Sequence, residues 1–326
     1  FSLLILLLEK YYLYEMEITM YFLVVLLSGL LTYFTQKIFI YYKKFDDFNH
    51  RSSHTTLATR AGGIGVFLTL FIISIFYYSQ SNEIFDYSLF VPLGIMFIVG
   101  VYDDFYNADF KLKFLLQIIV AKIIIDQGYV ISNYHGLFGF YEVPWLMAQL
   151  TTVFVFLVII NAINFIDGID GLAITEIIKT ILIIEFFSAN TTALRPLGVL
   201  IVICLLPLYY FNFKKKQKVF LGDGGSLFLG TIISIYIFYV LGDEFQFKEG
   251  FKINKTLFSV LVISYPLIDL FRVFILRIKD GESPFTADKR HIHHVLLKKG
   301  LTAFKSNILF LICYLLIFIM VWLIKT

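Results

Sequence analysis

The segment FVFLVIINAINFIDGIDG, residues 154–171, begins as a continuous apolar run and ends in two asparagines, two aspartates and two glycines. An apolar run of this kind, extended toward Gln149, is long enough to cross the hydrocarbon core of a bilayer as a helix. Amides and carboxylates at the edge of hydrocarbon are costly and usually functional. The segment therefore predicts a membrane helix that delivers polar side chains to one membrane surface.

The composition extends this prediction to the whole chain. Of the 326 residues, 59% are hydrophobic and only 16% are charged, and the mean hydropathy is +0.82. Because the apolar runs are continuous and lack the two-residue alternation of barrel strands, they predict helices. We expect a single all-α, polytopic membrane domain over residues 1–326 with about ten transmembrane helices. The runs start near Met20, Gly62, Tyr87, Phe114, Gln149, Leu172, Leu194, Ser226, Thr256 and Phe304.

The first 15 residues fit this domain less well than the rest. FSLLILLLEKYY at the start resembles a signal-peptide fragment or translated upstream sequence as much as a native segment. We therefore treat residues 1–15 as a non-native or poorly ordered extension, with Met16 and Met20 as alternative starts.

The positive charges predict the orientation of the helices. Alternate loops collect about sixteen lysines and arginines, against roughly six on the opposite side. Such an excess marks the cytoplasmic side of a membrane protein, so both termini should face outward. The net charge is only +3, and cations in juxtamembrane loops require no nucleic-acid partner. The loops on the predicted cytoplasmic side carry Lys43, Lys44, Arg51 and Arg60; Lys111 and Lys113; Lys214, Lys215, Lys216 and Lys218; and Arg277, Lys279, Lys289, Arg290, Lys298 and Lys299.

Four polar segments all fall on that predicted cytoplasmic side. They are GVYDDF (100–105), NAINFIDGIDG (161–171), VFLGDGGS (219–226) and SPFTADKRHIHH (283–294). Polarity confined to one face is typical of an enzyme whose soluble substrate does not cross the membrane. A transporter or flippase of a lipid-linked or anionic solute is the alternative, and it would need polar groups near mid-membrane. The candidates for such groups are Lys122, Asp126, Glu176, Lys179 and Glu185.

The first two segments place carboxylates where a purely structural role is unfavourable. Asp103 and Asp104 end an apolar helix, and a carboxylate there opposes the helix dipole. Asn161 and Asn164 share one helical face, so they either serve a site or form an ordinary hydrogen bond between helices. The acids that follow, Asp167 and Asp170, should lie on a turn that Gly168 and Gly171 permit.

The last two segments indicate phosphate chemistry. In FLGDGGS, Asp223 lies among three glycines just before a helix, where free N–H groups bind phosphate and its metal ion, although many such turns are only turns. HIHH holds three of the six histidines, at a spacing that does not suit a helical zinc pair. We expect His291, His293 and His294 to donate to phosphate oxygens. Together the segments predict phosphoryl transfer assisted by Mg²⁺ or Mn²⁺.

In this order, these segments resemble the bacterial polyprenyl-phosphate N-acetylhexosaminyl-1-phosphate transferases. The resemblance runs from about Lys43 to Leu301 and also includes PLIDLFRVFILR (266–277). It implies ten or eleven spans, an active site at the cytoplasmic face of the bacterial inner membrane, and transfer of a sugar-1-phosphate from a UDP-sugar to undecaprenyl phosphate with release of UMP. HIHH is similar to the branch that begins O-antigen, enterobacterial common antigen or teichoic acid linkage units. A monomer and a homodimer both stay open.

The resemblance also implies roles for individual residues. It makes Asn164 and Asp223 the ligands of Mg²⁺, stacks Phe220 on uracil and pairs Asp170 with that base. Asp103 or Asp104 would position or deprotonate the lipid phosphate. Lys113 would meet the diphosphate, and further substrate contacts would come from Asn161, Asp167, His291, His293 and His294.

One stretch departs from the family's pattern. Members usually carry proline before an Arg-x-Gly-Gly turn, whereas NHRSSHTTLATRAGG (49–63) has none, although Arg60, Gly62 and Gly63 match. We therefore expect the first inner loop to be shaped differently. The sequence does not identify the sugar, because the candidate N-acetylhexosamines differ by one hydroxyl group or its orientation.

Overall fold

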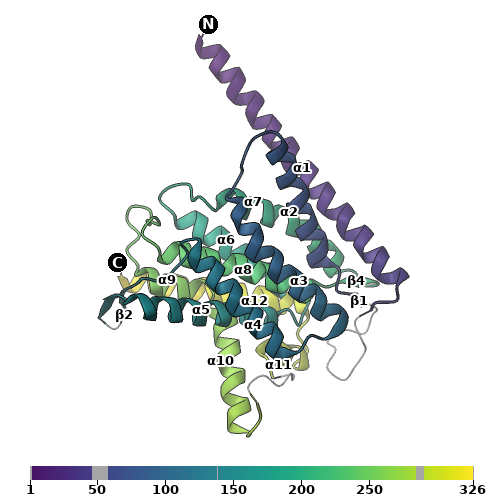
Figure 1. Cartoon of the computed structure of the whole chain (residues 1–326), viewed down its shortest axis with the longest axis vertical. Helices are drawn as coiled ribbons and strands as arrows, with labels where there is room; N and C mark the ends of the chain where they lie inside the picture. Colours follow the sequence, from purple (N-terminus) through teal and green to yellow (C-terminus); the bar gives the residue numbers. More distant parts are fainter. Residues whose placement is uncertain (1, 46–57, 138, 284–289, 326) are drawn as a thin grey trace.

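A computed structural model of the chain describes residues 2–45, 58–137, 139–283 and 290–325, and the described part is a bundle of helices with a few very short strands (Figure 1). The stretch 49–63, which departs from the family's sequence pattern, therefore lies largely outside the described residues. The all-α class predicted from the apolar runs is confirmed. Where the helices of the bundle lie side by side, α8 (Gly222–Leu241) runs through the middle.

Among the described residues up to Asn212, the chain forms seven α-helices, one short 3₁₀ helix and three strands. The long helix α1 leads into the bundle from the N-terminus, and a short hairpin connects α4 to α5 (Figure 1). These elements are α1 (Ser2–Tyr41), β1 (Ala58–Thr59), α2 (Gly62–Ser79), the short 3₁₀ helix η1 (Tyr87–Leu89), α3 (Phe90–Tyr106), α4 (Phe110–Asp126), β2 (Asn133–Leu137), β3 (Phe140–Glu142), α5 (Trp145–Ile166), α6 (Leu172–Phe187) and α7 (Arg195–Asn212).

The remaining elements close the bundle and add one projecting helix. They are β4 (Lys218–Val219) before α8, then α9 (Lys255–Val262), α10 (Ser264–Lys279), α11 (Ile292–Lys298) and α12 (Ala303–Lys325). The chain bends by 74° between α9 and α10, and α10 extends away from the bundle (Figure 1). Its outer face is apolar, because Ile268, Phe271, Ile275 and Ile278 are all exposed, as suits a helix in contact with lipid.

Seven helices of the described residues are long and apolar enough to cross a membrane, or up to eight if the bent pair α9 and α10 forms one span. Two expected spans, those starting near Phe114 and Leu172, correspond to α4 and α6, which are 17 and 16 residues long. A helix of that length is near the lower limit for crossing roughly 30 Å of hydrocarbon. The protein is thus a multi-pass membrane protein, and about ten spans remains the expectation.

Glycines allow two helices, α2 and α3, to approach α8 closely at its N-terminal end. A Cβ on Gly63 of α2 would lie 2.2 Å from the Cα of Gly225, and a Cβ on Gly100 of α3 would lie 2.2 Å from the carbonyl oxygen of Asp223. Neither position tolerates a side chain, because backbone atoms cannot yield as a flexible side chain can. The glycines of FLGDGGS therefore serve close helix packing, which brings the ends of α2 and α3 onto the start of α8.

Candidate active site

The structure brings the four polar segments of the sequence together at one end of the bundle. β1 pairs with β4 in parallel, and the backbone N–H groups of Gly62 and Gly63 donate to the carbonyl oxygens of Phe220 and Leu221 over 2.9 and 2.8 Å. Arg60, immediately after β1, therefore lies beside the start of α8. We call this end the polar end, and the described residues of all four segments lie there.

The carboxylate of Asp104 is hydrogen-bonded to the backbone at the start of α8. Its carboxylate accepts hydrogen bonds from the N–H groups of Asp223 (3.0 Å) and Gly224 (2.9 Å), and Arg60 lies 3.4 Å away. The side chain is only 3% exposed. The expectation that these N–H groups are free to bind phosphate is wrong, because a carboxylate from α3 already neutralises this helix N-terminus.

Asp103 faces a different set of partners. It accepts from the N–H of Ala108 at 2.7 Å and from the ammonium group of Lys113 at 2.6 Å. The same ammonium group lies 2.8 Å from the carboxylate of Asp223. Lys113 on α4 thus connects the acid that ends α3 with the acid that starts α8. The two adjacent aspartates differ in their contacts, and Asp103 is the one that contacts Lys113.

The two asparagines of α5 also separate. The amide of Asn164 donates to Asp223 at 3.0 Å and to the hydroxyl of Ser226 at 2.8 Å, so it joins the cluster. Asn161 instead donates to Gln117 on α4 at 3.0 Å and to a carbonyl of its own helix. Both asparagines therefore make hydrogen bonds between helices, Asn161 to α4 and Asn164 to the predicted site at the start of α8. We use the name acid cluster for Asp103, Lys113, Asn164 and Asp223.

The turn after α5 carries the next two acids. Burial raises the pKa of the Asp167 carboxyl well above its ordinary value, and the carboxylates of Asp223 and Asp104 add to the shift. Asp170 forms an ion pair with Lys218, the first residue of β4, and the carbonyl oxygen of Asp170 accepts from Asn307 of α12. The turn is thus connected both to the acid cluster and to the strand that precedes Phe220.

Phe220 lies between β4 and α8, and its backbone joins this connection to β1 and to the start of α2. Its N–H donates to Thr59 and its carbonyl accepts from Gly62. The ring is half-buried at the polar end, so it keeps a partly accessible surface. This placement is compatible with the expected stacking on a base.

The three histidines lie at the start of α11 and pack against the turn that follows α5. Ring centroids of His291 and His293 lie 5.4 Å apart and those of His293 and His294 4.4 Å apart. A Cβ on Gly168 would lie 2.7 Å from Nε2 of His293, so the imidazole packs directly on the turn. Burial lowers the pKa of His293 well below its ordinary value, with His294 and His291 adding to the shift. The neutral form of His293 is therefore favoured, and a neutral imidazole keeps one ring N–H that can donate a hydrogen bond.

Several contacts at the polar end were not predicted. The sequence predicts no contact at this end for Arg60, which matches the family's turn, or for Lys218, which lies in a basic loop, and it predicts none for Gln117 or Ser226. Asp269 lies within PLIDLFRVFILR (266–277), where the sequence predicts no function for it, yet it is fully buried and contacts His291. The signal available in the sequence was a carboxylate inside an apolar helix, which is costly unless paired.

The acid cluster suits a hard divalent cation. Two carboxylates and one amide are oxygen-bearing groups of the kind that Mg²⁺ prefers. The amide of Asn164 presents its nitrogen to Asp223 here, but nitrogen and oxygen of an amide exchange by a rotation of 180°. Among the described residues no three His, Cys, Asp or Glu side chains converge to hold a metal. A cation bound here would need oxygens from substrate and water, which is usual for Mg²⁺.

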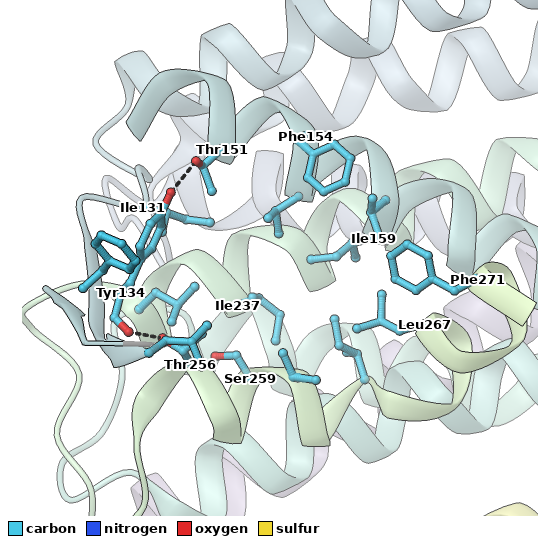
Figure 2. Close-up of a pocket in the computed structure, with 17 residues that line it drawn as sticks. Ile131, Tyr134, Thr151, Phe154, Ile159, Ile237, Thr256, Ser259, Leu267 and Phe271 are labelled. Atoms are coloured by element: carbon cyan, nitrogen blue, oxygen red, sulfur yellow. Dashed lines mark hydrogen bonds between the residues drawn. The ribbon is translucent and has the colours of Figure 1, made fainter. Parts of the chain in front are cut away.

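An apolar pocket of about 390 Å³ lies between α5, α8, α9, α10 and the β2–β3 hairpin (Figure 2). Its lining is almost entirely hydrocarbon, and its few hydroxyl groups include that of Thr151, bonded to Tyr134, and that of Thr256, which donates to the carbonyl of Tyr134. The pocket reaches Ile159, only two residues before Asn161 on α5. An apolar site therefore extends along the same helix that ends at the acid cluster.

The charged groups that a transporter would need are engaged elsewhere. Lys122 and Asp126 form an exposed pair within α4, and Glu176 and Lys179 form a buried pair within α6. Glu185 accepts from Thr192 and from Tyr236 at the other end of α6. Paired and hydrogen-bonded charges do not form a polar path through the bundle, so the transporter alternative is not favoured.

The sequence of this chain is similar to those of known proteins. The model of a family described as Glycosyl transferase family 4 matches residues 86–241, a range that includes the acid cluster and ends before the histidines. A Bacillus subtilis (strain 168) protein named "Probable undecaprenyl-phosphate N-acetylglucosaminyl 1-phosphate transferase" is 30% identical over 297 residues, which are 88% of this chain and 79% of that protein.

Two further relatives come from other bacteria. The "Decaprenyl-phosphate N-acetylglucosaminephosphotransferase" of Mycobacterium leprae (strain TN) is 30% identical over 277 residues, covering 77% of this chain and 69% of the relative. The "Undecaprenyl-phosphate alpha-N-acetylglucosaminyl 1-phosphate transferase" of Escherichia coli (strain K12) is 27% identical over 295 residues, covering 87% and 77%.

The fold and the site define a multi-pass membrane protein with one cluster of acids, a lysine and an amide at the end of its helices. With these relatives, the chain belongs to the polyprenyl-phosphate N-acetylhexosaminyl-1-phosphate transferases of glycosyl transferase family 4.

Proposed function

We propose that the protein transfers an N-acetylhexosamine 1-phosphate from a UDP-sugar to undecaprenyl phosphate and releases UMP. The observation that carries this proposal is the acid cluster, in which one ammonium group contacts both Asp103 and Asp223 beside the amide of Asn164. The named relatives act on polyprenyl phosphates, and an apolar pocket for such a lipid lies along the same helix.

The proposed reaction conserves atoms and charge in a simple exchange. An oxygen of the lipid phosphate forms a bond to the sugar-linked phosphorus of the donor, while the bond from that phosphorus to the bridging oxygen breaks. The bridging oxygen leaves with the electron pair as part of UMP. The lipid product carries a diphosphate joined to the sugar. The protein's task is to align the two oxygens and to stabilise negative charge, as in other phosphoryl transfers.

The acid cluster supplies both functions in this proposal. Asp103 positions the incoming lipid phosphate and accepts its proton if it is protonated. Lys113, which lies between the two carboxylates, donates to the donor diphosphate and offsets its charge. Asp223 and Asn164 would hold Mg²⁺, which supplies Lewis-acid stabilisation of the diphosphate. Asp104 stays in its structural role and keeps Asp223 oriented through the α8 backbone.

The nucleotide would lie on the side of the cluster formed by β4 and the turn after α5. Phe220 is half-buried and offers a surface for the uracil base. The carboxylate of Asp170 would accept a hydrogen bond from the base, either while it keeps its ion pair with Lys218 or after that pair opens. The histidines close this side against Gly168. Asn161 contributes indirectly, through its hydrogen bond to Gln117 on the helix that carries Lys113.

The acceptor's hydrocarbon chain would occupy the apolar pocket. A polyprenyl chain presents only methyl and methylene groups and double bonds, which match a lining of aliphatic and aromatic side chains (Figure 2). With the chain in the pocket, the phosphate at its head would emerge along α5 toward the acid cluster. The polar end would face the cytoplasm of a bacterial inner membrane, because its loops carry most of the positive charge.

A donor panel tests the proposal most directly. Membranes containing the protein are given undecaprenyl phosphate, Mg²⁺ and single UDP-sugars: UDP-N-acetylglucosamine, UDP-N-acetylgalactosamine, or the N-acetylfucosamine and N-acetylquinovosamine donors. Mass spectrometry of the extracted lipid should show one undecaprenyl diphosphate sugar, formed in equal amount with UMP. No lipid product with any donor, from protein that is folded and membrane-inserted, would refute the proposed function.

A further inference from the structure

Asp269 is a fully buried carboxylate on the projecting helix α10. Both of its oxygens are used by the segment that starts α11. One accepts from Nδ1 of His291 at 2.7 Å and the other from the backbone N–H of Ile292 at 2.7 Å. A carboxylate is removed from water only at considerable cost, so its partners compensate that cost and are in turn held by it.

The contact with Asp269 determines where the histidine cluster lies. His291 is packed against Phe165 of α5, with ring centroids 5.7 Å apart, and is stacked on His293 with an angle of 12° between the rings. His293 in turn lies 3.9 Å from the same Asp269 oxygen and packs on Gly168. Movement of His291 would therefore displace the imidazoles that contact the turn between Asp167 and Asp170.

The contact also selects the tautomer of His291. An ionised carboxylate only accepts hydrogen bonds, so Nδ1 of the ring must carry a proton. In the neutral ring this leaves Nε2 as an acceptor, as in other carboxylate–histidine pairs. An asparagine at position 269 could still accept from Ile292, but its amide group would donate to Nδ1 and move the ring proton to Nε2.

We infer that Asp269 is a positioning residue for the sugar-nucleotide side of the site, acting through His291. It orients the His291 ring, sets its tautomer and thereby arranges His293 and His294 against the 167–170 turn. Asp269 does not touch the substrate. This inference rests on the proposed transfer from a UDP-sugar, and it adds a function for a buried carboxylate outside the acid cluster.

The test compares Asp269→Asn with Asp280→Asn. Asp280 is a matched control, because it caps the same helix, is exposed, and pairs with Arg290 of the same segment without contacting the histidines. Loss of a partner that orients a functional histidine typically lowers activity by about 10- to 100-fold. We expect that loss in kcat/KM for the donor with Asp269→Asn, an unchanged KM for undecaprenyl phosphate, and less than about a twofold effect with Asp280→Asn.

Two further measurements separate positioning from simple loss of structure. In protein labelled with ¹⁵N-histidine, the spectrum of one histidine should change from the Nδ1–H to the Nε2–H form in Asp269→Asn. The double variant Asp269→Asn, His291→Ala should be no less active than His291→Ala alone, because both act through one ring. Additive losses, an unchanged tautomer, or wild-type kinetics in Asp269→Asn would each overturn the inference. Inactivity of the wild type with every donor would instead overturn the proposed function.

Discussion

Asp104 and Gly224 are 120 positions apart in the sequence, and the carboxylate of the first accepts a hydrogen bond from the backbone N–H of the second over 2.9 Å. A second bond, from the N–H of Asp223, completes the pair. The contact joins the end of α3 to the start of α8, and in the proposed function it gives Asp104 a structural role. Its neighbour Asp103, one residue earlier, is left to contact Lys113.

We predict that replacing Asp103 lowers turnover, whereas replacing Asp104 lowers stability. Asp103→Asn should leave thermal stability in detergent nearly unchanged and lower kcat by orders of magnitude, because it removes a charge from the acid cluster. Asp104→Ala should lower stability by about 1 to 3 kcal/mol, because two backbone N–H groups lose their acceptor. Thermal unfolding and turnover measured on the same preparations check both outcomes. Equal loss of stability in the two variants would contradict this division of roles.

The proposed metal site predicts a second pair of effects. Asp223→Asn keeps the shape of the side chain but removes its charge, so turnover should fall by orders of magnitude while the protein stays folded. Asn164→Ala should raise the Mg²⁺ concentration needed for half-maximal rate. Asp109→Asn is the control, since Asp109 is an acid at the start of α4 that only caps its own helix. Activity that survives exhaustive chelation would remove the metal from the site.

Binding of the donor base should depend on Phe220 and Asp170. A base stacked on an aromatic ring gains about 1 to 3 kcal/mol, so Phe220→Ala should raise the Kd of the UDP-sugar roughly 5- to 150-fold. Asp170→Ala should relax the preference for uracil over other bases. Isothermal titration with UDP-sugar and its cytidine analogue measures both effects.

Two variants serve as controls for the donor site. Tyr106→Ala removes an exposed ring at the end of α3 and should leave donor affinity unchanged. Lys218→Met removes the partner of Asp170 but not Asp170 itself, so base preference should persist. If Phe220→Ala and Asp170→Ala both bind the donor as the wild type does, neither residue contacts the nucleotide.

The apolar pocket predicts a selective effect on the lipid acceptor. Val158→Trp fills part of the pocket and should raise KM for undecaprenyl phosphate several-fold while KM for the UDP-sugar is unchanged. Leu150→Trp is the matched control, because Leu150 is an exposed residue of α5 that does not line the pocket. Equal effects of the two substitutions on the acceptor KM would show that the chain of the lipid binds elsewhere.

The proposed orientation predicts which loops can be labelled from outside the cell. In a variant without Cys204 and Cys313, a cysteine at Lys216 should resist a membrane-impermeant thiol reagent in intact cells and react after permeabilisation. A cysteine at Glu249, in the loop between α8 and α9, should react in both conditions. External labelling at position 216 would show that the orientation is the opposite of the proposed one, with the polar end outside the cell.

The helical membrane class could be predicted from the sequence because it depends on local composition. Continuous apolar runs can satisfy their backbone groups in hydrocarbon only as helices, whatever their neighbours are. The boundaries between spans were less certain, since α4 and α6 have 17 and 16 residues and the bend at Ile263 divides one apolar run into α9 and α10. Such a bend reflects packing against other helices rather than the hydropathy of the run.

The members of the site were predictable as residue types, because acids and amides at a membrane edge are costly without a function. Their individual partners were not. Nothing local to Asp103 and Asp104 distinguishes them, yet the helix rotation that places Asp104 under the α8 backbone turns Asp103 toward Lys113. Asn161 and Asn164 differ for the same reason.

The sequence by itself therefore determined that this chain forms membrane helices with a set of acids, an amide and histidines at one surface. Only the tertiary structure decided which of them meet, because contacts such as that of Asp269 with His291 depend on how separate helices rotate and pack against one another. Hydropathy depends on the residues within one span, whereas a hydrogen bond between α10 and the start of α11 requires both elements to be positioned to within a few tenths of an ångström.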